Sequence, residues 1–215
     1  MAFGLILLAV LLLATNMFEK KQVENMGESH LSIYADRLVP ATSIFEMRES
    51  MYHKRELLKD MLYTENRNMI DRQREIDSCN QAINHLLMEY KKTYFIGNEA
   101  GYLQEFEAGL QQYNLLENSI VHELNAGNMP LAVQLYEQET MPHFKTAVLK
   151  LSDLNHIQSV IGKDMVSDSN KAIASFLLLS DLETALIVVF SFIAHILIHA
   201  SRGIIRSKAE PFNLN

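Results

Sequence analysis

The chain is apolar at both ends and polar between them. Residues 1–18 contain no charged residue, and residues 184–201 contain none if their two histidines are neutral. A helix of about 18 or more apolar residues can cross the hydrocarbon core of a bilayer. We therefore expect two transmembrane helices, 1–18 and 184–201. A cleaved signal peptide is the alternative for the first segment, which lacks the positively charged start and small-residue cleavage site of such peptides.

Between these segments, residues 19–183 follow the period of a helix. Apolar residues recur at spacings of three and four, close to a 3.5-residue repeat, which is typical of helices packed in a bundle. We expect four apolar stripes to make the bundle core. They are Leu31, Tyr34, Leu38, Ala41, Phe45, Leu58 and Leu62; Ile76, Cys79, Ile83, Leu87, Tyr90 and Tyr94; Leu103, Phe106, Leu110, Tyr113, Leu116, Ile120 and Leu124; and Phe144, Val148, Leu151, Leu154, Ile157, Ile161 and Met165.

Three polar breaks separate these stripes, at 64–68, 96–101 and 125–130. They predict four helices, at 19–63, 68–95, 98–126 and 128 onward. Asn98 and Asn128 are plausible N-caps, Gly127 ends the third helix, and Pro130 falls in the first turn of the fourth. Pro40 and Pro142 fall inside helices, where each removes a backbone donor and predicts a kink.

These elements predict an all-α protein, an antiparallel up-down four-helix bundle flanked by two transmembrane helices. The expected organisation is a first transmembrane helix at 1–18, a bundle domain at 19–183, a second transmembrane helix at 184–201 and a short tail at 202–215.

Basic residues predict the orientation, because they collect on the cytoplasmic side of a membrane. Arg202, Arg206 and Lys208 follow the second apolar segment, so the C-terminus is expected in the cytoplasm and the bundle outside. Lys20 and Lys21, after the first segment, point the other way.

The charge and the single cysteine argue against nucleic-acid binding and against cysteine-based sites. The net charge is −7, and no basic stripe or glycine-rich phosphate loop is present, so nucleic acid is not an expected partner. Cys79 is the only cysteine, which excludes a disulfide within one chain and a cysteine-based metal site. We expect Cys79 to be a small buried residue, with an intersubunit disulfide as the remote alternative.

The helix punctuation resembles a known family. The stretch LNAGNMPLAVQLYEQETMPHFKTAVLKLSDL, residues 124–154, is similar to the junction of the last two helices in the four-helix-bundle sensor domain of methyl-accepting chemotaxis proteins. RLVPATSIF, residues 37–45, resembles that family's first helix with its proline. The positions that match the pattern are Gly127, Asn128, Ala132, Glu139, Pro142, Leu149 and Leu151.

The resemblance covers about residues 1–205 and implies a ligand-sensing receptor module in the bacterial inner membrane. Such a module is usually a homodimer with its bundle in the periplasm, and ligand binding shifts its last helix. In the family a HAMP connector and a signalling domain follow. The tail at 202–215 is too short for either, so we expect a sensor that acts through a separate signalling protein. The alternative is an accessory or structural membrane protein whose bundle binds a partner protein.

Small anionic ligands bind some members of the family between helices at the membrane-distal end of the dimer. In that region Arg48, Tyr52 and Arg55 recur at i, i+4 and i+7 and share a helix face. An arginine fork suits a carboxylate, and the tyrosine could add a hydroxyl or an aromatic wall. We hypothesise that these three residues contact the ligand. The alternative is that they are solvated charges, with the arginines paired to neighbouring glutamates.

The remaining chemistry of the sequence is sparse. The bundle di-iron motif Glu-x-x-His is absent, and Asp153 with His156 is its nearest match. His195 and His199 lie at i, i+4 in the second apolar segment, where they could bind a metal or haem, or pack as neutral side chains at a dimer interface. Methionines are scattered as in ordinary cores. We find no nucleophile motif, paired-carboxylate motif or HExxH, and therefore expect neither an enzyme nor a cofactor.

Overall fold

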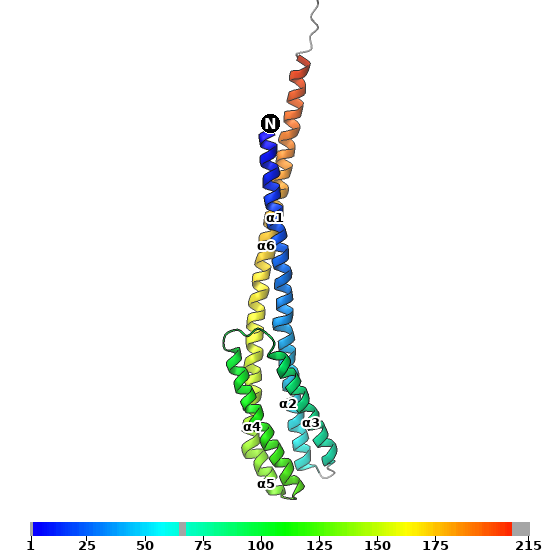
Figure 1. Cartoon of the computed structure of the whole chain (residues 1–215), viewed down its shortest axis with the longest axis vertical. Helices are drawn as coiled ribbons and strands as arrows, with labels where there is room; N and C mark the ends of the chain where they lie inside the picture. The colour runs from blue at the N-terminus through cyan, green and yellow to red at the C-terminus, as the bar shows by residue number, and fades with distance from the viewer. Residues whose placement is uncertain (1, 65–67, 208–215) are drawn as a thin grey trace, which may run out of the picture. The chain divides into compact units, whose positions relative to one another are not determined.

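The computed structural model describes the backbone of residues 2–64 and 68–207, and the side chains of residues 10, 12–64 and 68–196. Every described element is a helix (Figure 1). In chain order these are α1 (Ala2–Ile33), η1 (Tyr34–Leu38), α2 (Val39–Tyr63), α3 (Met69–Tyr90), α4 (Glu99–Asn125), α5 (Met129–Gln134), η2 (Leu135–Thr140) and α6 (Met141–Ser207), where η marks a π-helix.

The first and third predicted helix breaks agree with the structure, but the second is misplaced, since α3 ends at Tyr90 and α4 begins at Glu99, which puts the break at 91–98 and not at 96–101. α1, η1 and α2 follow one another without interruption, and so do α5, η2 and α6, so the described residues form four continuous helical segments. The all-α prediction is confirmed. Asn98 and Asn128 occupy the predicted cap positions, but neither side chain accepts a capping hydrogen bond. The Asn128 amide instead donates to Glu123 Oε2 at 2.9 Å.

Gly127 ends α4 in the left-handed region, with a φ of +77°. A residue with a Cβ is strained there, so Gly127→Ala is expected to lower the free energy of unfolding by about 1–2 kcal/mol. Thermal or denaturant unfolding in detergent would measure this. Gly27→Ala is the matched control, because Gly27 lies inside α1 with no atom within 4 Å of an added Cβ. The control should leave the free energy of unfolding unchanged or raise it by about 0.5–1 kcal/mol. If both variants lost the same stability, the left-handed backbone of Gly127 would not be the cause.

The helices gather in two compact units, Met1–Ser29 with Ser167–Asn215, and His30–Val166. In the second unit α2 packs against α3, and α4 packs against α5 and η2. Its buried apolar core draws on all four helical segments. The core members are Ile44, Met47, Met51, Leu57, Leu58, Met61, Leu62, Ile76, Ile83, Leu87, Tyr90, Leu103, Phe106, Leu110, Tyr113, Ile120, Ala132, Tyr136, Phe144, Ala147, Leu151 and Leu154.

The stripes predicted on the last three helices are largely confirmed, except that Tyr94 is 72% exposed. The first half of the first stripe is wrong. Leu31, Tyr34, Leu38 and Phe45 are all more than half exposed. This segment carries two faces with apolar residues at helical spacing, and the core takes the one that runs through Ile44, Met47, Met51 and Leu58.

The two prolines predicted to kink helices each follow a π-helix. η1 ends two residues before Pro40, and η2 ends two residues before Pro142. A π-helix inserts an extra residue into a turn and changes which side chains face inward. In η1 the residue turned inward is Arg37, which is 4% exposed.

One helical run among the described residues, Met129–Ile196, is long and apolar enough to cross a membrane. None of its most apolar stretch is buried within the structure. The first apolar segment is helical from Ala2, but most of its side chains lie outside the described ones. The side chains of Arg202 and Arg206 also lie outside the described ones, and Lys208 lies outside the described residues altogether.

Candidate functional site

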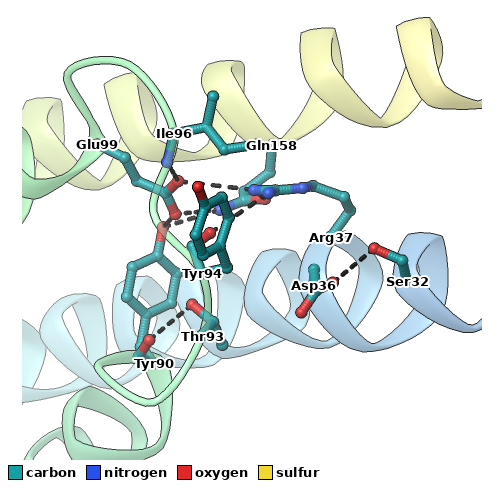
Figure 2. A network of polar contacts seen from close by, with 9 residues as sticks. All are labelled: Ser32, Asp36, Arg37, Tyr90, Thr93, Tyr94, Ile96, Glu99 and Gln158. Carbon is teal, nitrogen blue, oxygen red and sulfur yellow. Dashed lines mark hydrogen bonds and ion pairs between the residues drawn. The ribbon is translucent and has the colours of Figure 1, made fainter.

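Arg37 is the centre of a buried polar network at one end of the unit His30–Val166 (Figure 2). Its Nη1 donates to Gln158 Oε1 on α6 at 3.1 Å, and its Nη2 donates to the carbonyl oxygen of Tyr94 at 3.3 Å. The same Nη1 lies 3.6 Å from Glu99 Oε2. One guanidinium therefore joins η1, the 91–98 loop, the start of α4 and α6.

Glu99 is the acceptor at which the network converges. It is fully buried as the first residue of α4, where the positive end of the helix dipole favours a carboxylate. The hydroxyl of Tyr90 donates to its Oε1 at 2.6 Å, and the backbone amide of Ile96 donates to its Oε2 at 3.1 Å. The Gln158 amide also donates to Glu99 Oε1 and to the Tyr90 hydroxyl.

Burial, and next the hydrogen bond to Glu99, raise the pKa of Tyr90 far above its usual range. Tyr90 therefore remains a neutral donor, and the Arg37–Glu99 pair carries the charges. Networks of this kind need every partner, because removing one leaves a buried charge without compensation. The arrangement can hold the first and last helices of the bundle in one register.

A cavity of about 370 Å³ lies beside this network, within the same unit. It is lined by Arg37 and Gln158 together with Ile33, Leu38, Ala41, Asn155, Ser159, Gly162 and Val166. The cavity therefore lies between the first helix and α6 and is largely apolar. Leu38 and Ala41 also belong to the exposed stripe of the first helix.

A second buried network lies in the middle of the core, around Lys54. This lysine is 0% exposed, and its ammonium donates to Asn80 Oδ1 on α3 and to Asn114 Oδ1 on α4, the latter at 2.6 Å. It also lies 3.2 Å from Glu117 Oε2 on α4 and 4.9 Å from the ring centroid of Tyr113. Asn80 in turn donates to Glu117 Oε1 at 3.1 Å.

Burial lowers the pKa of Lys54 and raises the pKa of Glu117, since it opposes both charges. The geometry favours the charged pair, because the ammonium donates to two amide oxygens, lies 3.2 Å from Glu117 Oε2 and makes a cation–π contact with the ring of Tyr113. We therefore treat Lys54 and Glu117 as an ion pair that cross-links α2 and α4.

The three predicted ligand residues lie on α2, and the structure places two of them together. The guanidinium carbon of Arg55 lies 5.0 Å from the ring centroids of both Tyr52 and Phe144. Arg55 also pairs with Glu56 at 2.6 Å. Arg48 lies 5.6 Å from the ring centroid of Phe45 instead. Ligand contact by these residues stays a prediction.

The residues weighed for metal binding are dispersed. Among the described side chains no group of three or more His, Cys, Asp or Glu is placed to hold a metal ion. Asp153 lies 3.6 Å from Lys150, and His195 is exposed. The side chain of His199 lies outside the described ones. Cys79 is buried in α3, as predicted.

Arg37, Glu99 and Gln158 were missed by reasoning from sequence, and so was the pair of Lys54 and Glu117. A signal for Lys54 exists, since it follows Met51 by three residues and precedes Leu58 by four, which is core spacing. Arg37 carries the same signal, since it precedes Pro40 by three residues and Pro40 precedes Ile44 by four.

Comparison with known protein families finds a match over residues 1–173, to a family described as "Four helix bundle sensory module for signal transduction". The chain belongs to this family. The matched region contains both buried networks of the sensory module and the exposed stripe of its first helix. A search of curated proteins found no match.

Family membership assigns the sensory module to signal transduction, as the resemblance implied. Family membership also suggests why buried polar networks between helices matter in this protein. A sensor must convert a local event into a displacement of helices, and packed elements with discrete arrangements do this best. Arg37 and Gln158 connect the first and last helices of the bundle.

Proposed function

We propose that this chain is a receptor-like sensory protein of the bacterial inner membrane and acts as a homodimer. Two transmembrane helices would flank an antiparallel up-down bundle in the periplasm, with the C-terminus in the cytoplasm. Support for the membrane location comes from the exposed apolar side chains before Ile196 and from the first apolar segment. Support for the orientation comes from the basic residues after position 201.

The observation that carries the dimer is the exposed stripe on the first helix, defined as Leu31, Tyr34, Leu38, Ala41 and Phe45. Four of its five members are 53–71% exposed, although their spacing of three and four is that of a coiled-coil seam. A patch of this kind marks an interaction site. A second copy, presenting the same stripe, would cover both stripes at once in a two-fold arrangement.

Residues of the exposed stripe can be substituted without disturbing the buried core. Leu38→Lys and Phe45→Lys are each expected to raise the dimer dissociation constant at least about tenfold, since burying one such side chain contributes about 1.5–3 kcal/mol. Sedimentation or two-colour fluorescence in detergent would measure it. Met88→Lys is the matched control, because Met88 is 65% exposed on α3 outside the stripe. A control that dissociates as much as the stripe variants would refute this interface.

The ligand would be a small carboxylate. Arg48 and Tyr52 continue the spacing of the stripe after Phe45, so a dimer would bring them to the subunit interface beside Arg55. The aromatic rings of Tyr52 and Phe144, with centroids 5.2 Å apart, give the arginine fork a rigid backing. Displacement of α6, which is continuous from Met141 to Ser207, would pass the binding event toward the membrane.

Disulfide formation between subunits tests the sensing function. In a Cys79→Ala background, single cysteines would replace Leu149 and Val160, which are exposed on α6. Rates would be measured in membranes with acetate, succinate or citrate and without them. A carboxylate that changes the rates supports sensing, and the change should disappear in Arg55→Met. Rates that no carboxylate alters, together with a stoichiometric co-purifying membrane protein, would favour the accessory role instead.

A further inference from the structure

The cavity of about 370 Å³ beside Arg37 is separate from the predicted carboxylate site, since none of Arg48, Tyr52 and Arg55 lines it. All its lining residues belong to the unit His30–Val166, four from the first helical segment and five from α6. Sites for small molecules have volumes of this order and are mostly apolar, with a few polar groups that orient the ligand. The cavity therefore has the size and the composition of a ligand site.

Among the described residues that line the cavity, Arg37 alone is charged, and one of its donors is unused. Its Nη1 and Nη2 donate to Gln158 and to the Tyr94 carbonyl, whereas its Nε is buried and has no hydrogen-bond partner among the described residues. In Figure 2 the terminal nitrogens of Arg37 point toward Glu99 and Gln158, and Nε lies behind them along the stem. A buried donor without an acceptor costs free energy. An acceptor oxygen that enters the cavity against the guanidinium would remove this cost.

Gly162 leaves space in the cavity on the α6 side. It lies inside α6 without a positive φ, in a position where glycine is less favourable than alanine. The nearest atom to a Cβ added at Gly162 is the Cβ of Arg37, at 3.8 Å, which is ordinary van der Waals contact. Neither the backbone nor close packing therefore requires a glycine here. The missing side chain instead keeps the space beside Arg37 open, which is a functional reason for an isolated glycine in a helix.

We propose that this cavity binds a small uncharged molecule with an apolar body and an oxygen acceptor, such as a cyclic ketone. The oxygen accepts from Arg37 Nε, and the body packs against the apolar lining residues Ile33, Leu38 and Val166. A carboxylate fits less well, because Glu99 already lies 3.6 Å from Arg37 and would repel a second anion.

The rival occupant is a second copy of the chain, because Leu38 and Ala41 belong both to the cavity and to the exposed stripe. Four of the five side chains in that stripe carry no acceptor, so a partner stripe would leave most of the cavity without one. A small molecule therefore fits better. Bound there, it would contact the first helical segment and α6 at once and bias their relative position, which adds a second input to the sensor.

Cysteine labelling of the full chain in lipid vesicles tests this site. Ser159→Cys, at an exposed lining position, would be made in a Cys79→Ala background and labelled with N-ethylmaleimide. Ser152→Cys is the control position, because Ser152 is exposed on α6 and does not line the cavity. Cyclohexanone is the probe. At about four times its dissociation constant, about a fifth of the sites stay empty, so labelling of Ser159→Cys should slow about fivefold and that of Ser152→Cys should not change.

The acceptor is tested with compounds that carry the same ring. Cyclohexylammonium has no acceptor and should give no protection, and cyclohexanecarboxylate should protect less than the ketone. Gly162→Leu should abolish protection, because its side chain fills the cavity, and it should unfold no earlier than the unsubstituted protein, because it removes a glycine from a helix. Lys163→Leu is the matched control, since Lys163 is exposed at the next position of α6, and it should keep the protection.

Three results would overturn the proposal: labelling that cyclohexanone does not slow, equal or stronger protection by the charged compounds, and protection that survives Gly162→Leu. If cyclohexanone has no effect and labelling of Ser159→Cys speeds up when the protein is diluted in lipid, a second copy covers the cavity instead. No outcome depends on a carboxylate bound at Arg55, so failure of this site and failure of the proposed function are distinguishable.

Discussion

Lys54→Met is expected to lower the free energy of unfolding by about 3–5 kcal/mol, because it leaves the buried carboxylate of Glu117 without its counter-charge. Methionine fills nearly the same space as the lysine stem, so the loss reports the charge and its hydrogen bonds rather than a cavity. Thermal and denaturant unfolding in detergent, followed by circular dichroism, would measure it.

The double variant Lys54→Met with Glu117→Met should recover most of that loss, since replacing both partners of a buried pair by apolar residues is often neutral. The amides of Asn80 and Asn114 are half-buried and can hydrate. Lys59→Met is the control for loss of a surface charge, because the Lys59 side chain is 57% exposed, and it should change stability by less than about 0.5 kcal/mol. A Lys54→Met protein within about 1 kcal/mol of the unsubstituted one would refute the ion pair.

Arg37→Met is expected to have the second large effect on stability, concentrated at the end of the bundle that holds the 91–98 loop. It removes the donor that joins Gln158 on α6 to the Tyr94 carbonyl, and it leaves Glu99 buried without a cation. We expect a loss of about 3–5 kcal/mol and faster amide hydrogen exchange in the 91–98 loop than in α3. Exchange followed by mass spectrometry would locate the change.

Arg37→Lys should recover only part of the protection, because an ammonium cannot reproduce the planar fork that reaches two acceptors. Arg37→Met with Glu99→Gln should recover more, because the amide carries no charge and still accepts from the Tyr90 hydroxyl. Uniform acceleration of exchange along the whole bundle would contradict a local role. Unchanged exchange in the 91–98 loop would show that the network does not hold this end of the bundle.

The first helix shows where reasoning from sequence stops. Both the Leu31-to-Phe45 stripe and the Ile44-to-Leu58 face satisfy helical spacing, and one helix cannot turn both toward the same core. The structure buries the other face, with Lys54 among its members, since the cross-helix partners Asn80, Asn114 and Glu117 offset the desolvation of the lysine.

The candidate site shows the same limit. Spacing could place Arg37 on the buried face, three residues before Pro40, but it could not give its partners, which come from positions 94, 99 and 158. Glu99 could be placed at a helix start from its neighbours Gly97 and Asn98, but its burial could not.

Sequence alone determined the helices, two of their three breaks and the family of this protein. Helix starts and stops are local events, governed by Gly127, Pro130 and the spacing of apolar residues within a few turns. Tertiary structure alone decided which face of the first helix is covered, which charges are buried, and that Thr15 meets Glu183. Those outcomes depend on contacts between residues more than 25 positions apart, the Lys54–Asn80 contact being 26 apart and Thr15–Glu183 168 apart, and no pattern within a single helix encodes them.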